Sequence, residues 1–301
     1  MSQPFHIRLP ATSANLGPGF DALGLAMALY LTVDAVESAA YRIDATGRNA
    51  ELCARLENNL ILETYRGVLA AAGRPAPALH LTLDNQIPLG MGCGSSAAAL
   101  LAGVTLANHF GALGWSAQQI LEEACRREGH PDNVAACWLG GMTASAMQEG
   151  VVKTATCGQH LPWSLMLALP SASLATEKAR ALLPDVYSRA DAVTNVQNTA
   201  LLVAAFALGR ADLLATAMGD RMHQPFRAQA CPLLPRLLPL AGQGPVLGVA
   251  LSGAGPSVLL VCSSTAELQD VTARVHAAAG EDGIEVLATR LTNGAAAQFA
   301  G

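Results

Sequence analysis

Charged residues are scarce in this 301-residue chain, at 14% of the total, whereas hydrophobic residues make up 51%. The formal net charge is -5, and the basic residues are scattered rather than clustered. This balance excludes an intrinsically disordered chain and provides no basic surface for nucleic acid. Any anionic ligand must therefore be held by local geometry and not by overall charge.

Several targeting and metal signals are also missing. None of the seven cysteines forms a C-x-x-C pair and their spacing fits no zinc site, so we expect reduced thiols. The first nine residues lack a basic segment followed by an apolar one, which argues against a signal peptide. Residues 87–107 are uncharged, but their proline and glycines argue against a membrane span. We therefore expect a cytoplasmic protein with no nucleic-acid or membrane partner.

Hydrophobic periodicity predicts strands and helices in irregular order. Residues 11–20 are expected to form a turn-rich loop. Strands are expected at 5–9, 23–36, 79–84, 142–147, 151–155, 165–169, 246–251, 257–261 and 284–289. Helices are expected at 60–72, 96–109, 116–128, 177–182, 191–208, 212–218 and 266–279, with a short one ending at Trp138. Such mixing favours an α+β fold, and the length suggests two domains, residues 1–158 and 159–301.

The main functional signal is the segment 87–98, Ile-Pro-Leu-Gly-Met-Gly-Cys-Gly-Ser-Ser-Ala-Ala. Alternating glycines let the backbone turn tightly and approach a ligand without interference from a Cβ atom. Ser95 and Ser96 stand where a helix should begin, and the free N–H groups of a helix N-terminus bind phosphate. A glycine-rich turn that only caps a buried helix is the alternative.

Three familiar motifs do not fit this segment. No lysine occurs between Gly67 and Gly150, which excludes a Walker loop. Ser95 stands where the dinucleotide fingerprint requires its third glycine. The nucleophile elbow of hydrolases, G-x-S-x-G, matches neither Ser95 nor Ser96.

Pro88 to Ala98 does resemble the second signature of the galactokinase, homoserine kinase, mevalonate kinase and phosphomevalonate kinase (GHMP) superfamily. Pro10 to Asp21 is similar to the N-terminal signature of homoserine kinases, and so is Glu128 to Val134. Leu251 to Ser257 is similar to the third superfamily motif. The resemblance extends over almost the whole chain. Cys93 departs from it, because the family usually carries leucine or methionine there.

The resemblance implies a two-domain GHMP fold, with an N-terminal domain like ribosomal protein S5 domain 2 and a ferredoxin-like C-terminal domain. It also implies an ATP-dependent kinase that converts L-homoserine to O-phospho-L-homoserine in threonine biosynthesis, as a homodimer. The alternatives are a kinase of another small alcohol and a nucleotide-binding relative that has lost catalysis.

The implied ATP and metal residues lie mainly in the glycine loop. Magnesium is expected on a loop serine, assigned to Ser96 although Ser95 is open, and on Glu122, which precedes Asn133 by eleven residues. Without the resemblance Glu122 would be an ordinary solvated charge, and Glu123 and Glu128 are possible substitutes. The ATP site is expected to comprise Asn59, Pro88, Leu89, Gly90, Met91, Gly92, Cys93, Gly94, Ser95, Ser96, Ala97, Ala98, Gly253 and Gly255.

Acceptor recognition is expected from four segments outside the loop. The implied catalytic residues are Asn133, which can orient the acceptor hydroxyl but cannot take its proton at neutral pH, Thr176, and His130 as a base or a structural residue. Asp132 is expected to brace the turn. The ammonium of the substrate is assigned to Asp21 and Asn15, and its carboxylate to Arg180 and Arg227, with Arg221 less certain.

Overall fold

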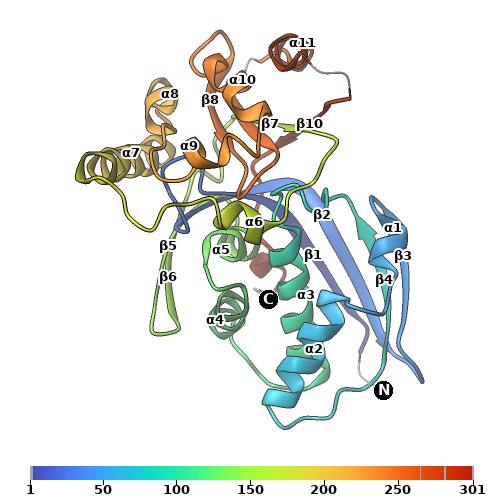
Figure 1. Cartoon of the computed structure of the whole chain (residues 1–301). Coiled ribbons are helices and arrows are strands. Elements are labelled where there is room, and N and C mark those ends of the chain that lie inside the picture. The colour runs from blue at the N-terminus through green and yellow to red at the C-terminus, as the bar shows by residue number, and fades with distance from the viewer. Residues whose placement is uncertain (1–2, 265, 281–282, 300–301) are drawn as a thin grey trace.

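The computed structural model describes residues 3–264, 266–280 and 283–299, and the side chains of Thr176 and Phe299 lie outside that description. Two β-sheets form its framework (Figure 1). The first has the strand order β3-β4-β2-β5-β6, with β1 paired to β2. Its strands are β1 (Phe5–Ala14), β2 (Leu23–Glu37), β3 (Arg42–Gly47), β4 (Leu79–Asn85), β5 (Met142–Gln148) and β6 (Val151–Cys157).

Helices pack against one side of this sheet, and α3 is the innermost of them (Figure 1). It contacts α2, α4, α5 and β1. Because it is apolar on nearly all sides, most of its side chains are buried. Gly94 occupies its N-cap position without a side-chain cap, so the first N–H groups remain available. The helices are α1 (Ala50–Cys53), α2 (Leu60–Ala71), α3 (Ser95–Phe110), α4 (Ala117–Glu128) and α5 (Asp132–Leu139).

The second sheet is antiparallel throughout, with the order β10-β7-β9-β8. Its strands are β7 (Ser164–Leu169), β8 (Val246–Leu251), β9 (Val258–Cys262) and β10 (Glu285–Arg290). In chain order this is the 4-1-3-2 arrangement of a ferredoxin-like sheet. The associated helices are α6 (Thr176–Arg180), α7 (Arg189–Leu208), α8 (Leu214–Ala217), α9 (Gln224–Arg227), α10 (Leu233–Leu237) and α11 (Leu268–Ala279), and 3-10 turns lie at η1 (Ala211–Leu213), η2 (Leu238–Leu240) and η3 (Ala295–Phe299).

The C-terminal end returns to the first sheet. Leu291 bridges to Met27 and Asn293 bridges to Gly140. The side chain of Gln298 accepts a hydrogen bond from the Arg8 amide at 2.9 Å. A boundary at 158/159 stays a prediction, and residues 291–299 lie against the first sheet even though they follow the second.

The α+β fold class is confirmed, with local differences from the sequence predictions. The prediction of a loop from residue 11 was wrong for its first part, because β1 runs on to Ala14. A register shift between Pro10 and Ala11 allows this continuation, and residues 11–14 are buried against β2. Neither β3 nor α1 was predicted, since each is short and lacks clear periodicity. No helix in the described ranges is long and apolar enough to cross a bilayer.

Candidate active site

Two glycine turns, one from each half of the chain, meet at the start of α3. Gly90, Gly92 and Gly94 have φ values of +69°, +72° and +70°, in the left-handed region that favours glycine. A Cβ atom at Gly92 would lie 2.1 Å from the carbonyl oxygen of Ser252. The Ser252 hydroxyl also donates to the Gly92 carbonyl at 2.8 Å. The glycines therefore allow the loop to pack directly on the 252–255 turn.

Substitution of Gly92 by alanine should be far more damaging than substitution of Gly90. Both changes strain a left-handed residue, at a cost of about 1 kcal/mol or more. At Gly92 the new methyl group also meets backbone oxygen at 2.1 Å, whereas at Gly90 it meets only the Ser173 side chain, at 3.3 Å. Thermal melting and ATP titration of both variants measure the difference. Equal losses in the two would show that strain alone matters.

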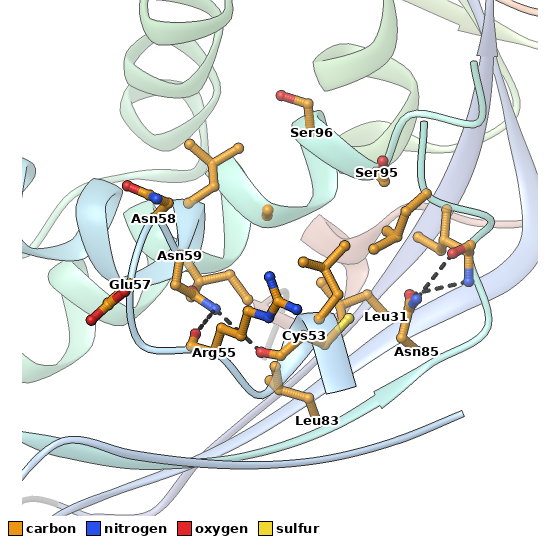
Figure 2. Close-up of a pocket in the computed structure, with 16 residues that line it drawn as sticks. Leu31, Cys53, Arg55, Glu57, Asn58, Asn59, Leu83, Asn85, Ser95 and Ser96 are labelled. Atoms are coloured by element: carbon orange, nitrogen blue, oxygen red, sulfur yellow. Dashed lines mark hydrogen bonds between the residues drawn. The ribbon is translucent and has the colours of Figure 1, made fainter. Parts of the chain in front are cut away.

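A pocket of about 490 Å³ opens beside α3 (Figure 2). Its wall is largely apolar and is built from α1, the start of α2, the middle of β2, the end of β4 and the first turn of α3. Asn59 lies in this wall, where its side chain accepts from the Leu62 amide and donates to the carbonyls of Cys53 and Arg55. It caps α2 and closes the pocket rim, so its amide is already engaged within the protein.

A second, smaller pocket of about 90 Å³ lies on the other side of the loop. Ser95 and Ser96 line both pockets, so the start of α3 lies at the border between them. The structure brings most of the predicted acceptor residues together here. The wall contains Asn15, Asp21, Gly90, Gly92, Cys93, Gly94, Ser95, Ser96, Glu128, His130, Asp132, Asn133, Leu174, Arg180, Arg227, Gly253 and Ala254.

The acidic residue that contacts the loop is Glu128, whereas Glu122, the predicted metal ligand, bonds within its own helix. The Ser96 hydroxyl donates to Oε2 of Glu128 at 3.0 Å. Glu122 instead accepts from Gln118 of its own helix at 2.8 Å. Glu128 follows Glu122 by six positions, which places them about 120° apart around α4 and about 9 Å apart along it. Burial raises the pKa of Glu128, and His130 and Ser96 partly oppose this effect.

Asn133, His130 and Asp132 form one hydrogen-bonded group at the start of α5. Oδ1 of Asp132 accepts from the backbone N–H of Asn133 at 2.7 Å and lies 2.6 Å from Nδ1 of His130. Burial lowers the pKa of His130, but its hydrogen bond to Asp132 and the neighbouring carboxylates outweigh burial and raise it. A raised pKa works against a base role for His130 near neutral pH. Asp132 braces this turn, as its sequence position indicates.

Asp21 and Arg180 form a two-pronged ion pair at the mouth of the pocket. The guanidinium donates to both carboxylate oxygens, at 3.0 and 2.8 Å. Asp21 has a left-handed backbone (φ 54°), and its amide donates to Oδ1 of Asn15 at 3.0 Å. Because Nδ2 of Asn15 donates to the Gly253 carbonyl at 3.0 Å, Asn15 holds the loop that presents Asp21.

Arg227 is a buried cation, with 2% of its surface exposed. Its guanidinium donates to the carbonyls of Ala179 (3.2 Å) and Gly253 (3.3 Å) and lies 3.2 Å from Nδ1 of His223. His223 Nε2 lies 2.7 Å from the Gly17 carbonyl, which requires a proton on Nε2 and leaves Nδ1 to accept from Arg227. None of these partners is an anion. Burial and the nearby Arg180 lower the pKa of Arg227.

Several predicted loop residues have other surroundings. Pro88 and Met91 line a separate pocket with Arg48 and Glu285. Cys93 is buried beneath the loop, where burial raises the pKa of its thiol to about 12, so it packs as a small uncharged side chain. The remaining positions are Leu89 on the larger pocket, Ala97 and Ala98 inside α3, Gly255 against Cys231, and Thr176, whose side chain lies outside the described part.

Sequence reasoning missed much of the larger pocket. Leu52, Cys53, Arg55 and Asn58 reach its wall from α1 and the turn after it, a segment without a clear pattern. Glu128 was weighed only as a substitute for Glu122. The signal that favours it is its place in Glu128 to Val134, immediately before the turn that carries His130.

The protein has the features of a two-domain small-molecule kinase, namely the sheet order, the glycine loop, and the acidic and basic groups around that loop. Models of the GHMP kinase N-terminal and C-terminal domains match residues 59–141 and 202–282. The chain belongs to the GHMP kinase family.

Individual relatives agree with this placement. A homoserine kinase of Solibacter usitatus is 50% identical over 258 residues, which cover 85% of this chain and 84% of the relative. One of Desulfitobacterium hafniense is 42% identical over 86% and 87% of the two chains. The crystal structure of a Cytophaga hutchinsonii homoserine kinase superimposes with a TM-score of 0.81 at 24% identity, covering 98% of this chain and 97% of that one, and is similar in fold.

Proposed function

We propose that this protein transfers the γ-phosphoryl group of ATP to the side-chain hydroxyl of L-homoserine, giving O-phospho-L-homoserine for threonine biosynthesis. The observation that carries the proposal is one pocket in which a glycine-rich phosphate loop faces an aspartate and two arginines. An α-amino acid carries an ammonium and a carboxylate, and these groups match that set of charges. The location in the cytoplasm and the homodimer remain predictions from the sequence.

ATP is placed with its base and ribose in the larger pocket and its phosphates along the loop. The apolar wall of the larger pocket suits a base, and Asn59 closes its rim. The β- and γ-phosphates lie at the start of α3 in this arrangement. There the free N–H groups can donate to them, and the positive end of the helix dipole attracts them. Ser95 and Ser96 border both pockets, which supports a nucleotide that passes from one into the other.

Magnesium fits the oxygen groups of Ser96 and Glu128, because it prefers hard oxygen ligands. Glu128 is a carboxylate whose charged form is disfavoured by burial, and a nearby cation would relieve that cost. When bound, the ion neutralises charge on the transferring phosphates. Ser95 is the alternative hydroxyl.

The acceptor is placed with its carboxylate at Arg227 and Arg180 and its ammonium at Asp21. The ion pair between Asp21 and Arg180 must open for this, since each residue then exchanges its partner for the oppositely charged group of the substrate. Asn133 orients the hydroxyl without removing its proton, which passes to the transferring phosphoryl group late in a loose transition state. His130 holds the turn in this mechanism, and Thr176 keeps its predicted role beside the acceptor.

The test is ADP release with Mg-ATP and L-homoserine, with phosphorus NMR to identify the product. Turnover should be at least about 100-fold less efficient with 4-hydroxybutanoate, which keeps the hydroxyl and carboxylate but lacks the ammonium. Mevalonate and galactose test the other small-alcohol kinases. ATP binding without turnover of any acceptor would favour a non-catalytic nucleotide-binding relative.

A further inference from the structure

Thr12 lies on β1 between the phosphate loop and α5, and its side chain is fully buried. Its amide donates to the Cys93 carbonyl at 3.0 Å. Its hydroxyl donates to Oδ1 of Asn133 at 2.7 Å. A Cβ atom at Gly94 would lie 1.8 Å from that hydroxyl, so the loop backbone rests directly on it. One residue thus contacts both the loop and the residue assigned to the acceptor hydroxyl.

The amide of Asn133 offers a ligand different groups according to its orientation. In the observed orientation Oδ1 accepts from Thr12, and Nδ2 lies 3.4 Å from Oδ1 of Asp132. The reverse orientation would set two acceptor oxygens against each other at Asp132. Asp132 thus selects the orientation of the amide, and the Thr12 hydroxyl fixes its position at 2.7 Å. Asn133 lines the smaller pocket of about 90 Å³, whereas Thr12 is not among the described residues of its wall.

We propose that Thr12 is a positioning residue for phosphoryl transfer. Through one hydroxyl it fixes the amide of Asn133 relative to the phosphate loop, so the acceptor hydroxyl and the γ-phosphate are held in line. The inference rests on the proposed kinase function, in which Asn133 orients the acceptor. Small misplacements of reacting groups are costly, since about 1 Å can lower a rate about 100-fold.

Thr12→Val removes the hydroxyl and nearly preserves the side-chain volume. It should lower kcat about 10- to 100-fold, with the KM values for ATP and acceptor changed less than about 3-fold. Thr12→Ser keeps the hydroxyl and should recover most of kcat. Thr105→Val is the matched control, because Thr105 is also buried and bonds only carbonyls of its own helix, at 2.7 and 2.9 Å. A Thr12→Ser variant as slow as Thr12→Val would overturn the proposal.

A double-mutant cycle tests whether Thr12 acts through Asn133. In an Asn133→Ala background, Thr12→Val should cost less than about 3-fold further in kcat, because the amide that it positions is gone. Fully additive losses would mean that Thr12 only supports the fold, and would refute a positioning role.

An NMR readout separates this inference from the kinase function. The side-chain amide signals of Asn133, identified by their loss in Asn133→Ala, should shift and exchange faster with water in Thr12→Val and stay unchanged in Thr105→Val. Absence of homoserine turnover by the wild type would refute the kinase function alone. Unchanged amide signals in Thr12→Val would refute the positioning role, whichever acceptor the enzyme uses.

Discussion

Glu128→Gln should lower kcat about 100- to 1000-fold, while Glu122→Gln should stay within about 2-fold of the wild type. Glutamine keeps the size of Glu128 and an oxygen that can accept from Ser96, but it removes the negative charge. Loss of one preorganised electrostatic group typically costs two to three orders of magnitude, about 2.7–4 kcal/mol. The Glu122 variant removes only a charge on the surface of α4, and its amide oxygen can still accept from Gln118.

The measurement is steady-state kinetics at several magnesium concentrations, with melting temperature as the control for folding. Glu128→Gln should require more magnesium for half-maximal rate, because a ligand charge is missing. Removal of a carboxylate whose pKa is raised by burial should leave stability unchanged or slightly higher. If Glu122→Gln is the impaired variant, the metal assignment returns to the position indicated by sequence spacing.

The contrast between these glutamates shows where sequence reasoning reaches its limit. A motif fixes residues close to one another in the chain, such as Glu128, His130 and Asn133, because a short turn leaves few arrangements. A spacing of eleven residues crosses from one helix to the next, and a difference of six residues there, about one and two-thirds turns, changes the helix face. Spacing alone therefore favours Glu122, while the contact of Ser96 favours Glu128.

Long-range packing decided the rest of the site. The glycine loop and its helix were predictable, because glycine spacing and an apolar run are local signals. The larger pocket was not, since α1 is four residues long and gives no periodicity. The close approach of Gly92 to Ser252 depends on residues far apart in sequence. A register shift extends β1 to Ala14 and brings Thr12 under the loop, and no local sequence pattern predicts this shift.

Arg227 combines local and long-range information. Its motif predicts a carboxylate ligand. The structure shows in addition that it is buried, with two carbonyls and an imidazole as partners. A buried cation without an anionic partner carries an uncompensated desolvation cost. The carboxylate of an amino acid would supply that partner within the pocket.

Arg227→Ala should therefore raise the KM for homoserine about 30-fold or more and leave the KM for ATP within about 3-fold. Truncating one member of a buried, hydrogen-bonded charge pair costs about 2–5 kcal/mol, which corresponds to about 30-fold or more in affinity. Arg221→Ala is the matched control, because Arg221 is a nearby but exposed arginine whose loss should change neither constant. Arg227→Gln retains a polar group for the Ala179 and Gly253 carbonyls and guards against misfolding as the cause. Equal increases in both KM values, with an intact melting temperature, would remove Arg227 from the acceptor site. If Arg227 binds the carboxylate that both acceptors share, Arg227→Ala should raise the KM for homoserine and the KM for 4-hydroxybutanoate by the same factor.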